Sequence, residues 1–430
     1  MTTTLQSKGK SPFRWVMLMF VCLFYFLILG FANQSFNILL GTITKDMGWE
    51  ATQRTAVATA MSSGMIWFVF VAGIMMDKFS VKKVLGSSVF ICAILIFLRG
   101  QATGFMFFFT LMFLFGAASA FYMPATTKII TLWFDADELA VANGCLTAAS
   151  PLGQITANYF AVKIMLAIGG WQTLYTMVGV IIVVLTIAFF VFGKDRKSEE
   201  ASLGSTTLTK DDLGLVKNVK GILKVPYVWL MIIANVFFLG SIYAGGTYGQ
   251  FVLQTDSGWL IDKAVSGKIP AWNNLSSMFA YILIPLFIAK IGRKHYVKIA
   301  IIAGVIAPIC FIVGYRSYNI TTISIMMVVA GICYGAIVPA PKILMLQRPE
   351  VSGPRAGTAL GIYVTAERIG ISVFVASLGT LISAGTMQMS HVLSYFYLLQ
   401  FIAPLLIFIG IFVNKHDAKK KAEEVIIVSP

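Results

Sequence analysis

Two charged side chains, Glu367 and Arg368, lie in the middle of an apolar segment long enough to cross a bilayer. Ionisable groups inside such segments are costly and usually face a cavity or a partner, so they mark candidate functional sites. An arginine keeps its charge when buried and can bind a carboxylate through two hydrogen bonds. We therefore expect Arg368 to bind an anionic substrate and Glu367 to carry a coupling proton. The alternative is that both join a structural ion-pair network with another helix.

Other polar side chains within apolar segments are candidates for lining a solute path. The expected substrate contacts, besides Arg368, are Tyr363, Asn33, Asn37, Tyr122, Asn158, Tyr243, Thr247 and Tyr334. Asn33 and Asn37 are four residues apart, so they share one helix face. The glycines at 240–249 would let the segment that carries Tyr243 and Thr247 bend or open locally. Asparagine and glycine also serve plain packing between membrane helices, which is the alternative here.

The composition of the chain predicts the helices that position these residues. The 430-residue chain is 58% hydrophobic and only 12% charged, whereas soluble proteins average about 25% charged residues. A helix needs about 20 apolar residues to cross a bilayer. We predict twelve such helices, over about 15–40, 54–76, 82–99, 103–130, 138–163, 171–193, 226–254, 270–290, 296–315, 321–346, 355–384 and 391–414. The expected fold class is an all-α integral membrane protein, with the lipid bilayer as a partner.

The distribution of the net charge of +15 argues against a nucleic-acid-binding protein. Most of the 33 Lys and Arg residues fall in alternate loops and near the two ends of the chain. By the positive-inside rule, this pattern predicts a multi-pass protein of the plasma (inner) membrane with both termini cytoplasmic. We expect a monomer with no nucleic-acid partner.

The chain carries an internal repeat. The tetrapeptide Asp46-Met-Gly-Trp49 recurs 210 residues later as Asp256-Ser-Gly-Trp259, and a Leu-Gly pair precedes each copy at the same offset. With both termini cytoplasmic, both copies of the tetrapeptide are expected at the extracytoplasmic ends of their helices. Many transporters bind solute at the interface of such repeats, so the repeat favours transport. We expect a six-helix bundle over 1–193, a cytoplasmic linker over 194–225, a second six-helix bundle over 226–414 and a cytoplasmic tail over 415–430.

Motifs of enzymes and metal sites are missing from the sequence. It contains no H-E-x-x-H, no phosphate-binding G-x-x-x-x-G-K-[ST] and no cysteine pair at metal spacing. The five cysteines are scattered through apolar segments, which is typical of small packing residues. We therefore expect no enzymatic activity, no metal site and no cofactor.

One motif points to a known family. Gly73-x-x-x-Asp77-Lys78-x-x-x-Lys82-Lys83 follows the second predicted helix. It resembles the loop between helices two and three of the major facilitator superfamily, usually written G-x-x-x-D-R-x-G-R-R. The resemblance implies two pseudo-symmetric six-helix bundles that alternate access to a central site. It also implies that these five residues form a conformational latch.

The setting of Arg368, residues 362–370, is similar to the eleventh helix of oxalate/formate antiporters, which place a substrate-binding lysine there. This resemblance implies secondary transport of a small organic anion, by proton symport or by exchange. Nitrate/nitrite porters of the superfamily carry arginines in their second and eighth helices. The segments 54–76 and 270–290 contain none beyond Arg54 at the edge. Inorganic-anion transport, neutral-solute transport and a transporter-like solute sensor are the alternatives.

Overall fold

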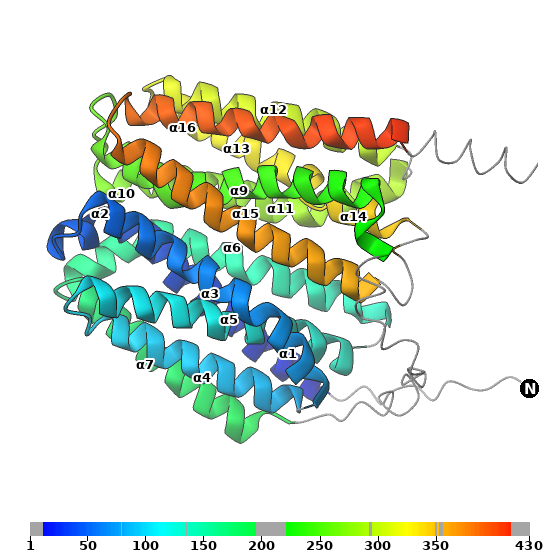
Figure 1. Ribbon diagram of the computed structural model, residues 1–430. Helices are drawn as coiled ribbons and strands as arrows, with labels where there is room; N and C mark the ends of the chain where they lie inside the picture. Colours follow the sequence, from blue (N-terminus) through cyan, green and yellow to red (C-terminus); the bar gives the residue numbers. More distant parts are fainter. Residues whose placement is uncertain are drawn as a thin grey trace, which may run out of the picture. The chain divides into compact units, whose positions relative to one another are not determined.

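The computed structural model describes residues 12–78, 80–134, 136–194, 221–291, 295–348, 351 and 356–413. The chain divides into two compact units, Met1–Thr207 and Leu208–Pro430, whose helices are shown in Figure 1. The predicted linker over 194–225 and the predicted tail over 415–430 lie almost entirely outside the described residues. Each unit is considered by itself below.

Unit 1 contains six long helical segments among its described residues. The first runs without a break through α1 (Phe13–Phe24), the π-helical segment η1 (Tyr25–Ala32) and α2 (Asn33–Asp46). The others are α3 (Ala51–Lys78), α4 (Val81–Arg99), α5 (Phe105–Trp133), α6 (Ala136–Ala167) and α7 (Trp171–Phe192). In this unit α5 packs against α3 and α4, α4 packs against α7, and α6 packs against η1 and α2.

Unit 2 repeats this arrangement. Its helices are α9 (Pro226–Thr255), α10 (Lys263–Ser266), α11 (Lys268–Ile291), α12 (Tyr296–Arg316), α13 (Ile320–Ile337), α14 (Ala340–Leu346), α15 (Ala356–Ser383) and α16 (Met389–Tyr397). A 3₁₀ turn, η5 (Leu398–Phe401), continues α16 into a helix that extends to residue 413. Here α13 packs against α11 and α12, α12 packs against α16, and α15 packs against α9. The same pairs of helices, counted in chain order, are therefore in contact in both units.

Matching glycines make close helix contacts in both units. A Cβ atom at Gly116 of α5 would meet the backbone of Met61 on α3. A Cβ atom at Gly331 of α13 would meet the backbone of Asn273 on α11. Small residues of this kind let membrane helices approach with their backbones in contact. The internal repeat therefore extends from sequence to packing.

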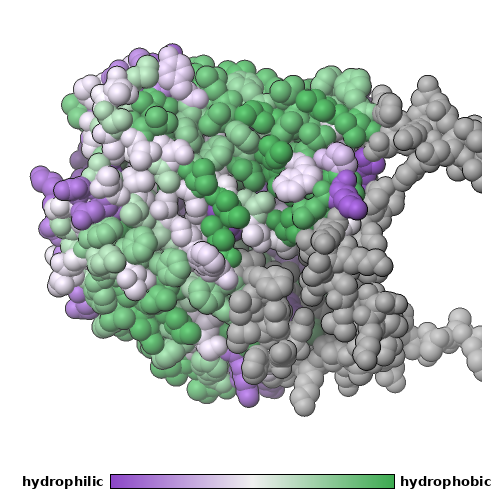
Figure 2. Space-filling view, viewed as in Figure 1, coloured by the Kyte–Doolittle hydropathy of each residue, from purple (hydrophilic) through white to green (hydrophobic). Residues whose placement is uncertain are grey.

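The surface of the helices fits a membrane protein. By length and composition alone, nine of the described helical segments could cross a membrane, and the remaining predicted spans coincide with α3, α6 and α11. Large apolar side chains are exposed along α7, among them Val184, Ile187 and Val191. Figure 2 shows hydrophobic residues over the helix flanks and hydrophilic residues gathered near helix ends. The predicted all-α membrane fold is confirmed.

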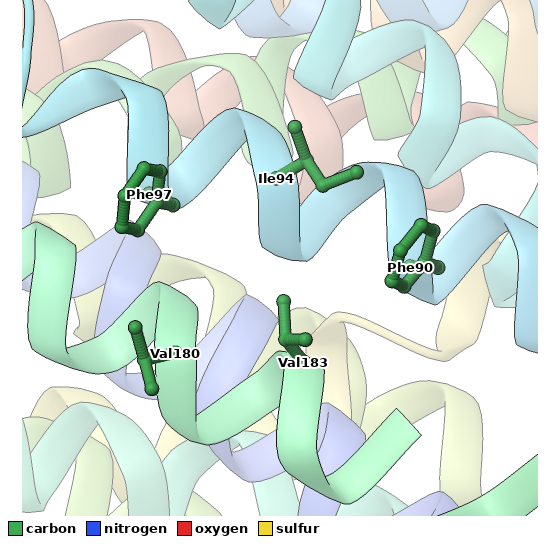
Figure 3. Close-up of a pocket in the computed structure, with 5 residues that line it drawn as sticks. All are labelled: Phe90, Ile94, Phe97, Val180 and Val183. Carbon is green, nitrogen blue, oxygen red and sulfur yellow. The ribbon is translucent and has the colours of Figure 1, made fainter. Parts of the chain in front are cut away.

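One open pocket lies on the flank of unit 1, between α4 and α7 (Figure 3). Its volume is about 300 Å³, and its lining consists of Phe90, Ile94, Phe97, Val180 and Val183. All five side chains are apolar, so the pocket offers no group that could hold an ion or orient a polar solute. The candidate site lies elsewhere.

Candidate functional site

The charged pair of α15 forms the centre of the candidate site in unit 2. Nη2 of Arg368 lies 3.3 Å from Oε1 of Glu367, and the two side chains are only 14% and 13% exposed. Adjacent helical residues point about 100° apart, so the two side chains must turn toward each other to make this contact. The distance exceeds the roughly 2.9 Å upper end that is typical of charge-assisted N–H···O bonds. The pair is therefore loose.

A second helix joins this pair through Asn235 of α9. Nδ2 of Asn235 donates a hydrogen bond to Oε2 of Glu367 at 3.1 Å, and Asn235 is 2% exposed. Both carboxylate oxygens of Glu367 are thus engaged, one within α15 and one across the contact between α9 and α15. A buried carboxylate needs such partners, because an unpaired one would be strongly destabilising.

Tyr363 lies one helical turn before Glu367 on α15, so the two side chains share a face. Tyr363 is 3% exposed, and its phenol is close enough to Glu367 for an electrostatic interaction. The structure therefore brings together three of the predicted site residues, Tyr363, Glu367 and Arg368, and adds Asn235. This set is called the α15 cluster below.

Asn235 was missed by sequence reasoning, although the repeat contains a signal for it. It lies 210 residues after Tyr25, which is the offset that separates the two Asp-x-Gly-Trp copies. In unit 1 the hydroxyl of Tyr25 accepts a hydrogen bond from Oγ1 of Thr126 at 3.2 Å. The matching positions thus carry polar side chains that reach a neighbouring helix in both units.

Polar side chains also form a chain across α2 and α6 in unit 1. Nδ2 of Asn37 donates to Oε1 of Gln34 at 3.5 Å, and Nε2 of Gln34 donates to Oδ1 of Asn158 at 3.0 Å. Asn158 is 3% exposed, and Asn33 is half-buried at the start of α2. Gln34 therefore connects two of the predicted contacts, Asn37 and Asn158.

The two predicted tyrosines at matching positions lie in aromatic packing. Tyr122 is fully buried, and its ring makes an edge-on contact with Tyr25 at 5.6 Å between centroids. Tyr334 makes an edge-on contact with Phe238 at 5.7 Å and stacks on Phe311 at 5.8 Å. These contacts are what the packing alternative expects, since aromatic pairs contribute beyond the area they bury.

The predicted local opening of the seventh helix is not observed, because α9 is a continuous α-helix from Pro226 to Thr255. Its glycines make room for neighbours instead: a Cβ at Gly245 would meet the hydroxyl of Tyr397. Oγ1 of Thr247 donates to the carbonyl of Tyr243 at 2.9 Å, and Tyr243 itself is 43% exposed. In unit 1, by contrast, the first span contains the π-helical segment η1.

The residues of the predicted latch are only partly described. Gly73, Asp77 and Lys78 belong to the end of α3, whose side chains lie outside the described part of the chain. Nζ of Lys82 donates to the carbonyls of Phe190 at 3.0 Å and Gly193 at 2.5 Å, at the end of α7. Lys83 is exposed. Lys82 therefore satisfies carbonyl groups that the helix end leaves unpaired.

The sequence profile of the Major Facilitator Superfamily matches residues 21–375, most of the chain. The chain belongs to this superfamily. A solved structure agrees with that fold: a bacterial homolog of the human lysosomal transporter Spinster, in an inward-facing and unoccupied conformation, aligns with a TM-score of 0.73. That alignment covers 94% of this chain and 98% of the other, at 15% identity.

Two curated proteins are similar to this major facilitator protein in sequence. A probable sulfoacetate transporter of Cupriavidus necator is 25% identical over 47% of this chain and 46% of its own length. A candidate tartrate transporter of Agrobacterium vitis is 22% identical over 79% of this chain and 80% of its own length. With the first of these relatives, the match spans about half of either protein.

Proposed function

We propose that this protein is a secondary-active transporter of a small organic carboxylate, working by alternating access. The α15 cluster carries the proposal, because it brings an arginine and a carboxyl group of α15 together with a buried amide of α9. The named substrates of the two relatives, sulfoacetate and tartrate, are carboxylates. A guanidinium suits this class, since its planar donors match a carboxylate.

The loose ion pair suggests how substrate and proton are coupled. An uncompensated charge in a low-dielectric interior is costly, so the cluster favours states in which its charges balance. With Glu367 ionised, the carboxylate of Glu367 compensates Arg368. When Glu367 accepts a proton, the guanidinium can take the substrate carboxylate instead. One anion and one proton then enter together, which is proton symport; displacement of Glu367 by the anion alone would give exchange.

The remaining predicted residues keep supporting roles in this proposal. Tyr363 and Asn235 position Glu367 within unit 2. The proposed path residues besides the α15 cluster are Asn33, Asn37, Asn158, Tyr122, Tyr243, Thr247 and Tyr334. Gly73, Asp77, Lys78, Lys82 and Lys83 form the proposed latch. We place the protein in the inner (plasma) membrane as a monomer, with both termini cytoplasmic.

Uptake into proteoliposomes tests the proposal, with tartrate as the first substrate and sulfoacetate as the second. Arg368→Gln should reduce uptake by at least a hundredfold, because a site that loses its charged partner loses several kcal/mol of binding. Arg316→Gln, which removes an exposed cation from the end of α12, should leave uptake unchanged. Near-normal uptake by Arg368→Gln would contradict the assignment of the anion site.

Glu367→Gln separates the two coupling modes. This variant should lose uptake driven by a pH gradient and retain counterflow of labelled against unlabelled substrate. Unchanged proton coupling would exclude Glu367 as the carrier. Substrate binding by the wild-type protein without counterflow would instead support a solute sensor.

A further inference from the structure

Arg99 is a buried cation that the α15 cluster does not use. It is the last residue of α4 in unit 1, and it is 0% exposed. Its guanidinium carbon lies 4.1 Å from the centre of the Phe115 ring on α5. None of its three guanidinium nitrogens has a hydrogen-bond partner among the described residues. Buried guanidinium groups are rarely left this way, so Arg99 requires an acceptor.

The groups around Arg99 do not neutralise it. The titratable side chains that interact with it are the phenol of Tyr175, on α7, and the thiol of Cys92, on its own helix. Phenols and thiols are uncharged near neutral pH in their ordinary range. The hydroxyl of Tyr175 is likewise buried, and it lies beside the hydroxyl of Ser35 on α2. Among the described residues, the titratable groups that interact with Arg99 therefore include no carboxylate.

The matching residue of unit 2 shows what is unusual about Arg99. Arg316 is the last residue of α12, which corresponds to α4, and its guanidinium carbon lies 4.6 Å from the ring centre of Tyr395. Arg316 is exposed, so water can solvate it, whereas Arg99 is not. The cation–π contact is common to both positions and offsets only part of the desolvation cost.

We propose that Arg99 and Tyr175 hold a small inorganic anion, of which chloride is the most abundant, inside unit 1. The nitrogens of Arg99 and the hydroxyl of Tyr175 would donate hydrogen bonds to it. An anion with a single negative charge would balance the single positive charge of the guanidinium. Phe115, Cys92 and Tyr175 are all fully buried, so their close packing around Arg99 excludes a long organic anion. None of these residues belongs to the α15 cluster or to the proposed substrate path.

The anion would connect three helices of unit 1. Arg99 ends α4, Phe115 belongs to α5 and Tyr175 belongs to α7. An ion that binds only the folded protein raises its free energy of unfolding by RT ln(1 + [L]/Kd), where [L] is the free concentration of the ion and Kd its dissociation constant. The structure therefore predicts that the folded protein responds to halide concentration, in addition to any response to its transported substrate.

The first test measures the unfolding temperature of the purified full-length protein in detergent. Chloride or bromide replaces a bulky anion without a carboxylate, the sulfonate Hepes, at constant ionic strength, so that general screening stays the same and no candidate substrate is present. A saturable rise in unfolding temperature is expected for the wild type and for Arg316→Gln, and no rise for Arg99→Gln. The absence of a halide response in the wild type, or an equal response in Arg99→Gln, would overturn the proposal.

A milder variant covers the case in which Arg99→Gln does not fold. Tyr175→Phe removes one donor and keeps the ring, so the apparent Kd for bromide should rise about tenfold, the loss of one charge-assisted hydrogen bond. An unchanged Kd would contradict the site. Crystals grown in bromide give a direct readout: an anomalous peak beside Arg99 supports the proposal, and water alone at that position refutes it.

Discussion

The backbone amide of Ser390 donates a hydrogen bond to Oδ2 of Asp256 at 2.8 Å, across 134 residues of sequence. Asp256 directly follows the last residue of α9, and Ser390 lies in the first turn of α16. Oδ1 of the same carboxylate accepts from Nε2 of Gln388 at 3.0 Å and from the amide of Gly258 at 2.9 Å. The aspartate of the Asp-x-Gly-Trp motif therefore caps the last helix of its unit from the end of the first.

The copy of this motif in unit 1 makes the corresponding connection. Oδ2 of Asp46 accepts from the indole of Trp171 at 2.8 Å and from Nε2 of Gln172 at 3.0 Å, both at the start of α7. Asp256 is 2% exposed, whereas Asp46 is exposed. The repeated tetrapeptide thus connects the first and last helices within each unit.

Asp256→Asn should destabilise the protein more than Asp46→Asn does. The asparagine at 256 removes a charge-assisted cap and leaves a buried donor unmatched, which costs about 1–3 kcal/mol. At position 46 the side chain is exposed, and Oδ1 of an asparagine can still accept from the indole of Trp171, so the expected cost is below about 1 kcal/mol. Thermal unfolding of the two purified variants, side by side, measures the difference. Equal losses would contradict the assignment of Asp256 as the stronger cap.

Two glycines of α6, Gly153 and Gly144, should respond differently to substitution by alanine. A Cβ atom at Gly153 would lie 2.8 Å from Cα of Gly30 in η1 and would also meet the Phe26 carbonyl, whereas a Cβ at Gly144 meets nothing within 4 Å. Gly153→Ala should force α6 and η1 apart and cost several kcal/mol, as overpacking does. Gly144→Ala should be neutral or stabilising by up to about 1 kcal/mol. The yield of monodisperse protein and its unfolding temperature report both outcomes; a well-folded Gly153→Ala would show that the crossing can relax.

Much of the fold was predictable, because each membrane-spanning helix requires a long run of apolar residues and such runs are visible in the sequence. The lengths of α4 and α7 follow from runs of apolar residues with turn-forming residues at their ends. The π-helical segment η1 was not predictable, because it lies where Gly30 meets Gly153 of another helix. Such a feature depends on tertiary contact, and η1 itself is a run of ordinary apolar residues.

The candidate site was predictable in part. The positions of Glu367 and Arg368 within a span follow from composition, but their contact depends on rotamers, and the bond to Asn235 depends on how α9 packs on α15. From the sequence alone, Arg99 is expected to be a cation in a loop at the end of a helix. Helical side chains point back toward the helix N-terminus, which directs this one into the bundle. Local sequence does not reveal whether the neighbouring helices then enclose it.

Lys82 and Lys83 are adjacent in the motif that resembles the superfamily latch, yet their environments differ. Lys82→Met should lose the bonds to the carbonyls of Phe190 and Gly193 and destabilise the end of α7 by about 1 kcal/mol. Lys83→Met should leave the unfolding temperature unchanged, because Lys83 is exposed. Transport rates measured on the same two variants test the latch separately. A loss of stability in Lys83→Met equal to that in Lys82→Met would contradict the capping role.

The ion pair between Arg14 and Glu138 gives the last prediction. Nη2 of Arg14, in α1, lies 2.8 Å from Oε1 of Glu138 in α6, and the side chains are 12% and 26% exposed. Partial burial and a short distance should make this pair stronger than an exposed one, with a coupling energy of about 1–2 kcal/mol.

A double-mutant cycle measures that coupling. Arg14→Met and Glu138→Gln should each lower the free energy of unfolding, and the double variant should lose less than the sum of the two. The charge swap, Arg14→Glu with Glu138→Arg, should recover part of the loss, because the two helices would again present opposite charges. Strictly additive losses would mean that each side chain acts through other neighbours, such as the ring of Trp15 that lies 5.9 Å from the Arg14 guanidinium carbon. In that case α1 would depend instead on its packing against the end of α5, where Phe13 contacts Trp133 and Trp15 contacts Phe134.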